Sequence, residues 1–388
     1  MSDKSKGLSK AREIYQNRPH RVKELKAEGK KIIGYPCMYV PLEIITALGL
    51  VPYRTYGDIA EPVTEADKAL PTAFCPIMRT CLDCALKAKD DFLDGMVAIH
   101  SCDPQDKTTR VWQSYISYPY FHLIDMPGTL RTESLEYFKG QLNDFKKTLE
   151  SFAGKELPSD KLKAAIELYN RQRVLVRELY KLTKPDPPLI SGTEMLQVIK
   201  ALMSLPAAEG NELLTQVISE VKERKDGPEK KPARLLIWSS TLDNIDIMQL
   251  FEAGANVVMD ESCGGIRAYR ADVKLTDDPL DGLSDYYLKE ITCARTFREA
   301  VFGEARKDYI ADLDSRFGYL KDFIRGWNIN GAILFLVRYC DPFAFEMPGL
   351  KDYLDHLGIP STYIEYDYTQ GSLAPLRTRA EAFLETID

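Results

Sequence analysis

Two segments of the sequence share one plan, an apolar run that ends in Cys-Asp-Pro. In the first, residues 95–99 lead through His100 and Ser101 to Cys102; in the second, residues 331–337 lead through two further residues to Cys340. Nearly continuous apolar runs of this length are typical of strands buried on both faces of a parallel sheet. The repeated plan predicts two related units, each with a buried strand that delivers a cysteine to the same edge of its sheet.

The rest of the sequence alternates between strand and helix patterns, which indicates an α/β fold with doubly wound parallel sheets. A chain of 388 residues also exceeds what one compact core usually holds. We expect two flavodoxin-like domains with additional helices: an N-terminal α/β domain with a helical extension over residues 1–200, and a C-terminal α/β domain over 201–388. The expected strands are 31–35, 50–53, 95–100, 234–238, 256–259, 331–337 and 361–365. The expected helices are 7–28, 41–48, 76–89, 135–152, 160–181, 244–253, 297–326, 349–357 and 376–386.

Composition excludes several classes of function. The net charge of −7 argues against nucleic acid or an anionic membrane as the main partner. Residues 1–31 are rich in charge and lack the apolar core of a signal peptide. The longest apolar runs are strand-sized and too short to cross a bilayer. We therefore expect a cytoplasmic protein.

Eight cysteines need an explanation in a reducing compartment, where structural disulfides are rare. Cys102 and Cys340 follow buried strands, at the sheet edge where α/β proteins bind ligands. Cys75 precedes Pro76 and is expected to cap a helix, whose N-terminus stabilises a thiolate. Three such thiolates could hold an iron–sulfur cluster with one iron left open for a ligand. Alternatively, each cysteine is a small buried apolar residue.

The other cysteines leave more than one interpretation open. Cys37 and Cys263 also lie near strand ends and are possible additional ligands. Cys81 and Cys84 share one face of a predicted helix, where they either pack in the core or point toward the cluster. A zinc site would need a second pair at suitable spacing, and the sequence has none. Cys293 has no clear context.

Several motifs together resemble the family of 2-hydroxyacyl-CoA dehydratases and ATP-dependent benzoyl-CoA reductases, over nearly the whole chain. They are GYPCMYVPLEII at 34–45, FCP at 74–76, residues 94–103, SGTEML at 191–196, ESCGGIR at 261–267, YCDPF at 339–343 and LRTRAEAF at 376–383. The resemblance implies two flavodoxin-like domains and a cluster, most simply a 4Fe-4S cluster, held by Cys75, Cys102 and Cys340. It also implies pairing with a homologous second subunit, or with itself, and a separate ATP-hydrolysing iron–sulfur activator. The absence of a G-x-x-x-x-G-K-[ST] loop here agrees with ATP being hydrolysed elsewhere.

The chemistry implied by the resemblance is low-potential, one-electron reduction of an acyl-CoA thioester or of an aromatic ring conjugated to it. Residues 369–377 resemble the end of the reductases, which slightly favours a benzoyl-CoA reductase subunit over a 2-hydroxyacyl-CoA dehydratase. Candidate proton donors are Glu43, His100 and Glu346; alternatively, the carboxylates are merely solvated and the histidine is a hydrogen-bonded core residue.

Two other interpretations of the function remain. One is a protein with an 8Fe-9S double cubane, held by about six thiolates, that reduces small molecules. The other is a non-catalytic electron-transfer or scaffold subunit.

Overall fold

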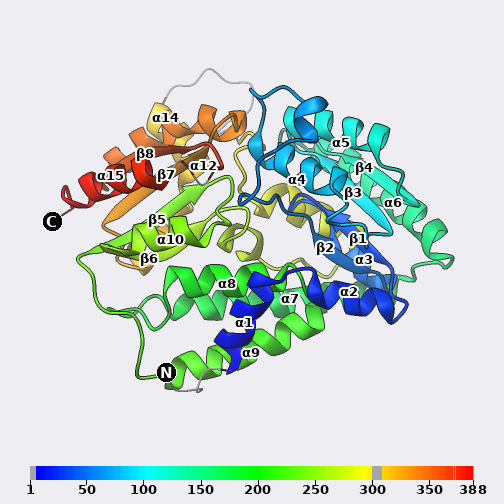
Figure 1. Ribbon diagram of the computed structural model, residues 1–388, viewed down its shortest axis with the longest axis horizontal. Coiled ribbons are helices and arrows are strands. Elements are labelled where there is room, and N and C mark those ends of the chain that lie inside the picture. Colours follow the sequence, from blue (N-terminus) through cyan, green and yellow to red (C-terminus); the bar gives the residue numbers. More distant parts are fainter. Residues whose placement is uncertain (1–5, 299–307, 370, 372, 388) are drawn as a thin grey trace.

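The structure, a computed structural model, describes residues 6–298, 308–369, 371 and 373–387, and contains two four-stranded parallel sheets (Figure 1). The first sheet has the order β2-β1-β3-β4 and the second the order β6-β5-β7-β8, so both halves use the same connectivity. The strands are β1 Ile32–Tyr35, β2 Val51–Arg54, β3 Gly95–His100, β4 Tyr120–Asp125, β5 Ala233–Ser239, β6 Ala255–Glu261, β7 Gly331–Val337 and β8 Ser361–Tyr366. The expectation of two flavodoxin-like α/β domains is confirmed.

The apolar runs of the sequence form the strands, and the helices that cover both sheets shield these apolar side chains from water. Every residue of β5, β6 and β7 is buried, as is every residue of β3 except His100. The helices and short helical turns of the two α/β units are α3 Leu42–Ala47, η1 Ala66–Lys68, α4 Pro76–Leu86, α5 Asp103–Tyr115, α10 Ile245–Glu252, η2 Ile266–Tyr269, α11 Pro279–Asp285, η3 Tyr286–Glu290, α12 Tyr309–Phe317, α13 Leu320–Gly326, α14 Asp341–His356 and α15 Leu373–Leu384.

A third layer of helices joins the two α/β units along the lower side of Figure 1. It contains α1 Lys6–Gln16, α2 His20–Ala27, α7 Ser159–Lys181, α8 Gly192–Leu202 and α9 Ala207–Glu223, while α6 Thr132–Ala153 covers the outer side of the first sheet. Helix α7 packs on α9 and α3, whereas α8 packs on α10 and β6 of the second sheet. The predicted boundary at residue 200 therefore falls inside α8.

The capping signals in the sequence lie at helix starts in the structure. The Ser191 hydroxyl accepts the Glu194 backbone N–H at 3.1 Å, and the Glu194 carboxylate accepts the Ser191 N–H at 2.9 Å. This capping box begins α8. Cys75 is the N-cap of α4, which confirms the prediction made from Pro76.

Several element predictions differ from the structure. The single helix expected over 7–28 is two helices, because Pro19 lacks the N–H that a continuous helix needs. Strand β4 and helices α5, α9 and α11 are absent from the predicted elements. The helix expected over 297–326 is divided into α12 and α13, and residues 299–307 lie outside the described part. Among the described helices, none is long and apolar enough to span a membrane.

Candidate functional site

The carboxyl ends of the two sheets face each other across the middle of the molecule. Cys37 follows β1 and Ser101 follows β3, and the Cys37 thiol donates to the Ser101 hydroxyl at 3.7 Å. From the end of β2, Arg54 reaches across to the second unit and donates to the Cys263 sulfur at 3.3 Å. The strand-end residues predicted to be functional therefore meet at one interdomain edge, as expected for doubly wound sheets.

The three cysteines predicted as cluster ligands occupy one kind of position. Cys75, Cys102 and Cys340 are the N-cap residues of α4, α5 and α14, and each of these helices has a proline in its first turn. Proline suits this place because the first N–H groups of a helix have no intrahelical partner. Each sulfur thus lies at the positive end of a helix dipole, which favours the thiolate form that binds metal.

These three thiols also influence one another. Burial raises the pKa of Cys340 well above its usual value, and the nearby Cys75 and Cys102 raise it further. Burial likewise raises the pKa of Cys75 to about 12, with a contribution from Cys102, although the N–H groups of Met78 and Ile77 oppose the rise. Three adjacent thiolates, with Cys75 buried and Cys102 and Cys340 half-buried, therefore need positive charge between them, and a bound iron–sulfur cluster would supply it.

The described thiols do not form a site for a single metal ion. Within the described ranges, no three Cys, His, Asp or Glu side chains converge closely enough to hold one metal ion. A cluster spreads its protein ligands over several irons, so its thiolates need not surround a single point.

A second group of thiols lies beside the first. Burial raises the pKa of Cys37 to about 12, and Cys263 and Cys293 add to the rise. The two groups are linked through Ser101, which precedes Cys102 and contacts Cys37. Cys293 has no signal in the sequence, because the segment after η3 reaches the site only by tertiary packing. There Arg295 holds it in place by donating to the Ser101 carbonyl at 2.9 Å.

Cys263 differs from the other thiols because cations surround it. Burial opposes its ionisation, but Arg54, Arg267 and Lys200 outweigh this effect and lower its pKa. Arg267 is fixed by Glu261, whose carboxylate it meets with both side chains fully buried. Gly264 leaves space for Lys200, since a Cβ there would lie 2.1 Å from the lysine Nζ.

Two of the predicted proton donors lie in buried ion pairs. Glu43 is completely buried, paired with Arg173 and hydrogen-bonded to the Tyr287 hydroxyl at 2.8 Å. Glu346 pairs with Arg316 at 2.9 Å and is 9% exposed. The alternative that these two carboxylates are merely solvated is therefore wrong.

His100 and the C-x-x-C cysteines lie in three different settings. His100 is 40% exposed in its side chain, and its Nδ1 lies 3.0 Å from the Asp125 carboxylate. Cys81 is packed in an apolar core with Leu82 and Trp112, while Cys84 lines a separate cavity.

Known proteins resemble this chain along most of its length. A benzoyl-CoA reductase subunit from Thauera aromatica is 27% identical, with 92% of this chain and 91% of the relative aligned. The (R)-phenyllactyl-CoA dehydratase beta subunit from Clostridium sporogenes is 24% identical over the full length of both. The beta subunit of (R)-2-hydroxyglutaryl-CoA dehydratase from Acidaminococcus fermentans is 24% identical over 93% of this chain and 94% of its own. The model of the family described as 2-hydroxyglutaryl-CoA dehydratase, D-component, matches residues 37–387, and this chain therefore belongs to that family.

Proposed function

We propose that this chain is the iron–sulfur subunit of an ATP-activated, low-potential reductase or dehydratase that acts on an acyl-CoA thioester. The observation that carries the proposal is the meeting of Cys75, Cys102 and Cys340, each at the N-terminus of a helix, at one interdomain edge. The names of the relatives, which are benzoyl-CoA reductase and 2-hydroxyacyl-CoA dehydratase subunits, support the substrate class. The ending at residues 369–377 slightly favours the benzoyl-CoA branch.

When bound, a cluster of this kind supplies single electrons at low potential. The protein's own part is to hold the thiolates and to keep water away. The N-terminal turns of α4, α5 and α14 hold the three sulfurs, and Arg295 fixes the backbone beside Cys102.

Among the candidate proton donors, His100 is the most accessible. Asp125 binds its Nδ1, which leaves Nε2 to carry a proton to or from a substrate. Glu43 and Glu346 would have to leave their arginine partners before they could exchange protons.

The proposed partners follow from the family. The relatives are themselves named as single subunits of larger enzymes, which supports a complex with a homologous second subunit. A separate ATP-hydrolysing iron–sulfur activator is proposed as the electron donor.

Anaerobic purification followed by iron and sulfide analysis tests the proposal. We expect about four irons per chain and a change in the visible or EPR spectrum when the complex meets benzoyl-CoA or a 2-hydroxyacyl-CoA. Iron with no spectral response to any acyl-CoA would favour an electron-transfer or scaffold subunit. A chain without iron would contradict the proposal.

A second candidate is the 8Fe-9S double-cubane protein, and the second group of thiols favours it. Cys37, Cys263 and Cys293 lie beside the first three, so six cysteines gather at the edge. This candidate predicts about eight irons per chain. It also predicts that Cys263→Ala and Cys293→Ala each remove a large part of that iron, whereas a single cubane on the first three thiols would leave it unchanged.

A further inference from the structure

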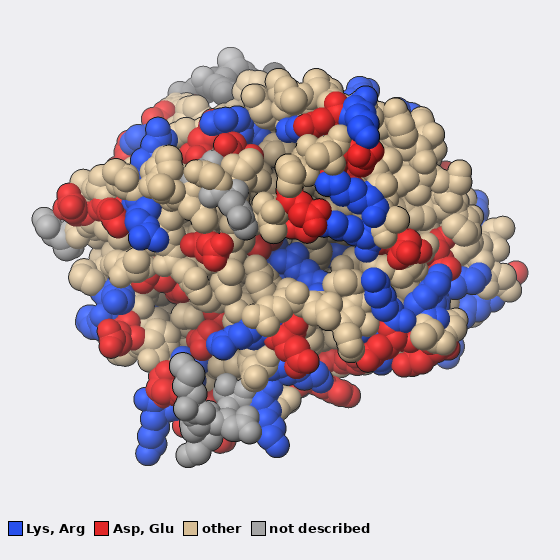
Figure 2. Space-filling model, in the orientation of Figure 1, with Lys and Arg blue, Asp and Glu red and all other residues tan. Residues whose placement is uncertain are grey.

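A second cavity of about 390 Å³ opens on the face shown in Figures 1 and 2; none of the six thiols of the two groups lines it, although Thr55 in its wall directly follows Arg54, which donates to the Cys263 sulfur. Its walls come from the α1–α2 connection, the segment after β2, the end of α4, and the loops after β5 and β8. Figure 2 shows Lys or Arg atoms set back in a hollow near the centre of this face. Its size lies in the range of small-molecule sites.

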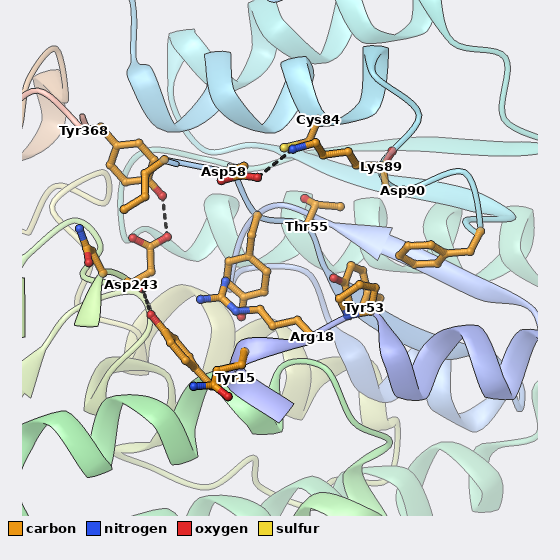
Figure 3. A pocket seen from close by; sticks show the side chains of 17 residues that line it. Tyr15, Arg18, Tyr53, Thr55, Asp58, Cys84, Lys89, Asp90, Asp243 and Tyr368 are labelled. Atoms are coloured by element: carbon orange, nitrogen blue, oxygen red, sulfur yellow. Dashed lines mark hydrogen bonds and ion pairs between the residues drawn. The ribbon is translucent and has the colours of Figure 1, made fainter. Parts of the chain in front are cut away.

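One cation in this cavity forms no ion pair. Arg18 lies over the Tyr56 ring at 3.9 Å and the Tyr15 ring at 4.9 Å, and no described carboxylate lies within ion-pair distance of it. Because aromatic rings occupy the face of a guanidinium, the N–H groups in its plane can still bind an acceptor. Figure 3 shows Arg18 in the middle of the cavity, among residues from both domains.

A polar group in the cavity wall also lacks a partner. The Thr55 hydroxyl has no hydrogen-bond partner in the described structure, although the residue is only 5% exposed. A buried hydroxyl without a partner is unfavourable by about 1–3 kcal/mol. Thr55 and Arg18 therefore offer two kinds of donor to the same cavity, a combination suited to an anion.

Of the other charged groups in the wall, Lys89 and Asp243 are already engaged, and Asp90 adds a further carboxylate. Lys89 pairs with Asp58 and Glu61, both at 2.8 Å. The Asp243 carboxylate accepts the Tyr368 hydroxyl at 2.6 Å, and it is close enough for its charge to act on Arg18 as well. Since these carboxylates add negative charge around the cavity, a ligand with one negative charge fits better than a phosphate with two.

Aromatic side chains complete the wall. Tyr53 and Phe92 meet edge to face, with ring centroids 5.2 Å apart, and both line the cavity together with Tyr15, Tyr56 and Tyr368. Such surroundings favour a ligand that carries a ring. We propose that this cavity binds an aromatic monocarboxylate, with its carboxylate on Arg18 and Thr55 and its ring toward Tyr53 and Phe92.

The proposal is tested by calorimetric titration of the full chain with 3-phenylpropionate, its uncharged alcohol 3-phenylpropan-1-ol, and inorganic phosphate. This readout does not depend on iron or on catalytic activity, so it stands apart from the function proposed above. We expect the acid to bind, and the alcohol and phosphate to bind at least about tenfold more weakly, because charged hydrogen bonds are the stronger ones.

Three variants test the assigned residues. Arg18→Gln should weaken binding of the acid about tenfold or more. Thr55→Val should weaken it about threefold without lowering Tm, because it removes a hydroxyl that has no partner. Arg21→Gln is the control: Arg21 pairs with Glu209 and Glu24 outside the cavity, so binding should be unchanged.

The proposal is overturned if the acid fails to bind at millimolar concentration or if the alcohol binds equally well. Phosphate that competes at equal affinity would also overturn it, by making the cavity a general anion site. The proposal is also overturned if Arg18→Gln binds 3-phenylpropionate with the affinity of the wild type. The comparison of acid with alcohol decides the matter even if Arg18→Gln fails to fold.

Discussion

The buried pair of Glu43 and Arg173 joins α3 of the first α/β unit to the helical layer, and the loss of one partner alone should strongly destabilise the protein. The two side chains are 0% and 6% exposed, and Tyr287 and Asn170 supply the remaining hydrogen bonds at 2.8 and 2.9 Å. Arg173→Leu would leave the Glu43 charge buried with only a tyrosine hydroxyl beside it. Removing one partner of such a pair destabilises a protein by about 3–5 kcal/mol.

That loss should lower Tm by roughly 10 °C, at about 2–4 °C per kcal/mol for a domain of this size. Differential scanning calorimetry of the iron-free chain measures it directly. The control is Arg177→Leu, one turn further along α7, whose pair with Asp272 is partly exposed, at 27% and 43%, and should contribute less than about 1 kcal/mol. The double variant Glu43→Gln with Arg173→Leu should recover part of the loss, since no unpaired charge remains.

Equal Tm values for Arg173→Leu and Arg177→Leu would refute this reasoning. Glu43 would then not be held by its partner, and its predicted role as a proton donor would gain support. A large loss would instead assign Glu43 mainly to the joining of α3 and α7.

Three further predictions concern stability. Burial raises the pKa of Asp260 to about 6, and its Oδ1 has no hydrogen-bond partner in the described structure. The unfolded chain loses this proton near pH 4, so stability should fall by up to about 3 kcal/mol as the pH rises from 4 to 6; Asp260→Asn should remove that slope in urea titrations. Gly282→Ala should destabilise α11 by about 1–3 kcal/mol, because its Cβ would lie 2.1 Å from the Lys274 carbonyl oxygen. Gly140→Ala, in open space on α6, should stabilise the protein by about 0.5–1 kcal/mol. The packing described would be contradicted if either substitution left the free energy of unfolding unchanged or shifted it in the opposite direction.

The parts of the fold that depend on local pattern could be predicted from the sequence. Continuous apolar runs identify seven of the eight strands, and the Ser191 box and Pro76 locate helix starts. Strand β4 escapes prediction because its residues, YFHLID, are only partly buried and alternate irregularly. The division at Pro19 shows that one proline outweighs a continuous charged pattern.

The candidate site could likewise be predicted only where a local sequence pattern indicates it. Cys75, Cys102 and Cys340 carry a local signal, since each is followed by a helix with proline in its first turn. Cys293 and the cations around Cys263 carry none, because Arg54 and Lys200 come from elements distant in the sequence. The burial of Glu43 against Arg173, 130 residues away, likewise depends on tertiary packing.

The central proposal is that Cys75, Cys102 and Cys340 hold an iron–sulfur cluster. Iron and acid-labile sulfide should be measured in the anaerobically purified wild type, in each single alanine variant of these residues, and in Cys81→Ala as the matched control from the core of α4. We predict that each of the three variants loses most of its iron and sulfide, while Cys81→Ala retains both. Full iron in all three variants would contradict the assignment.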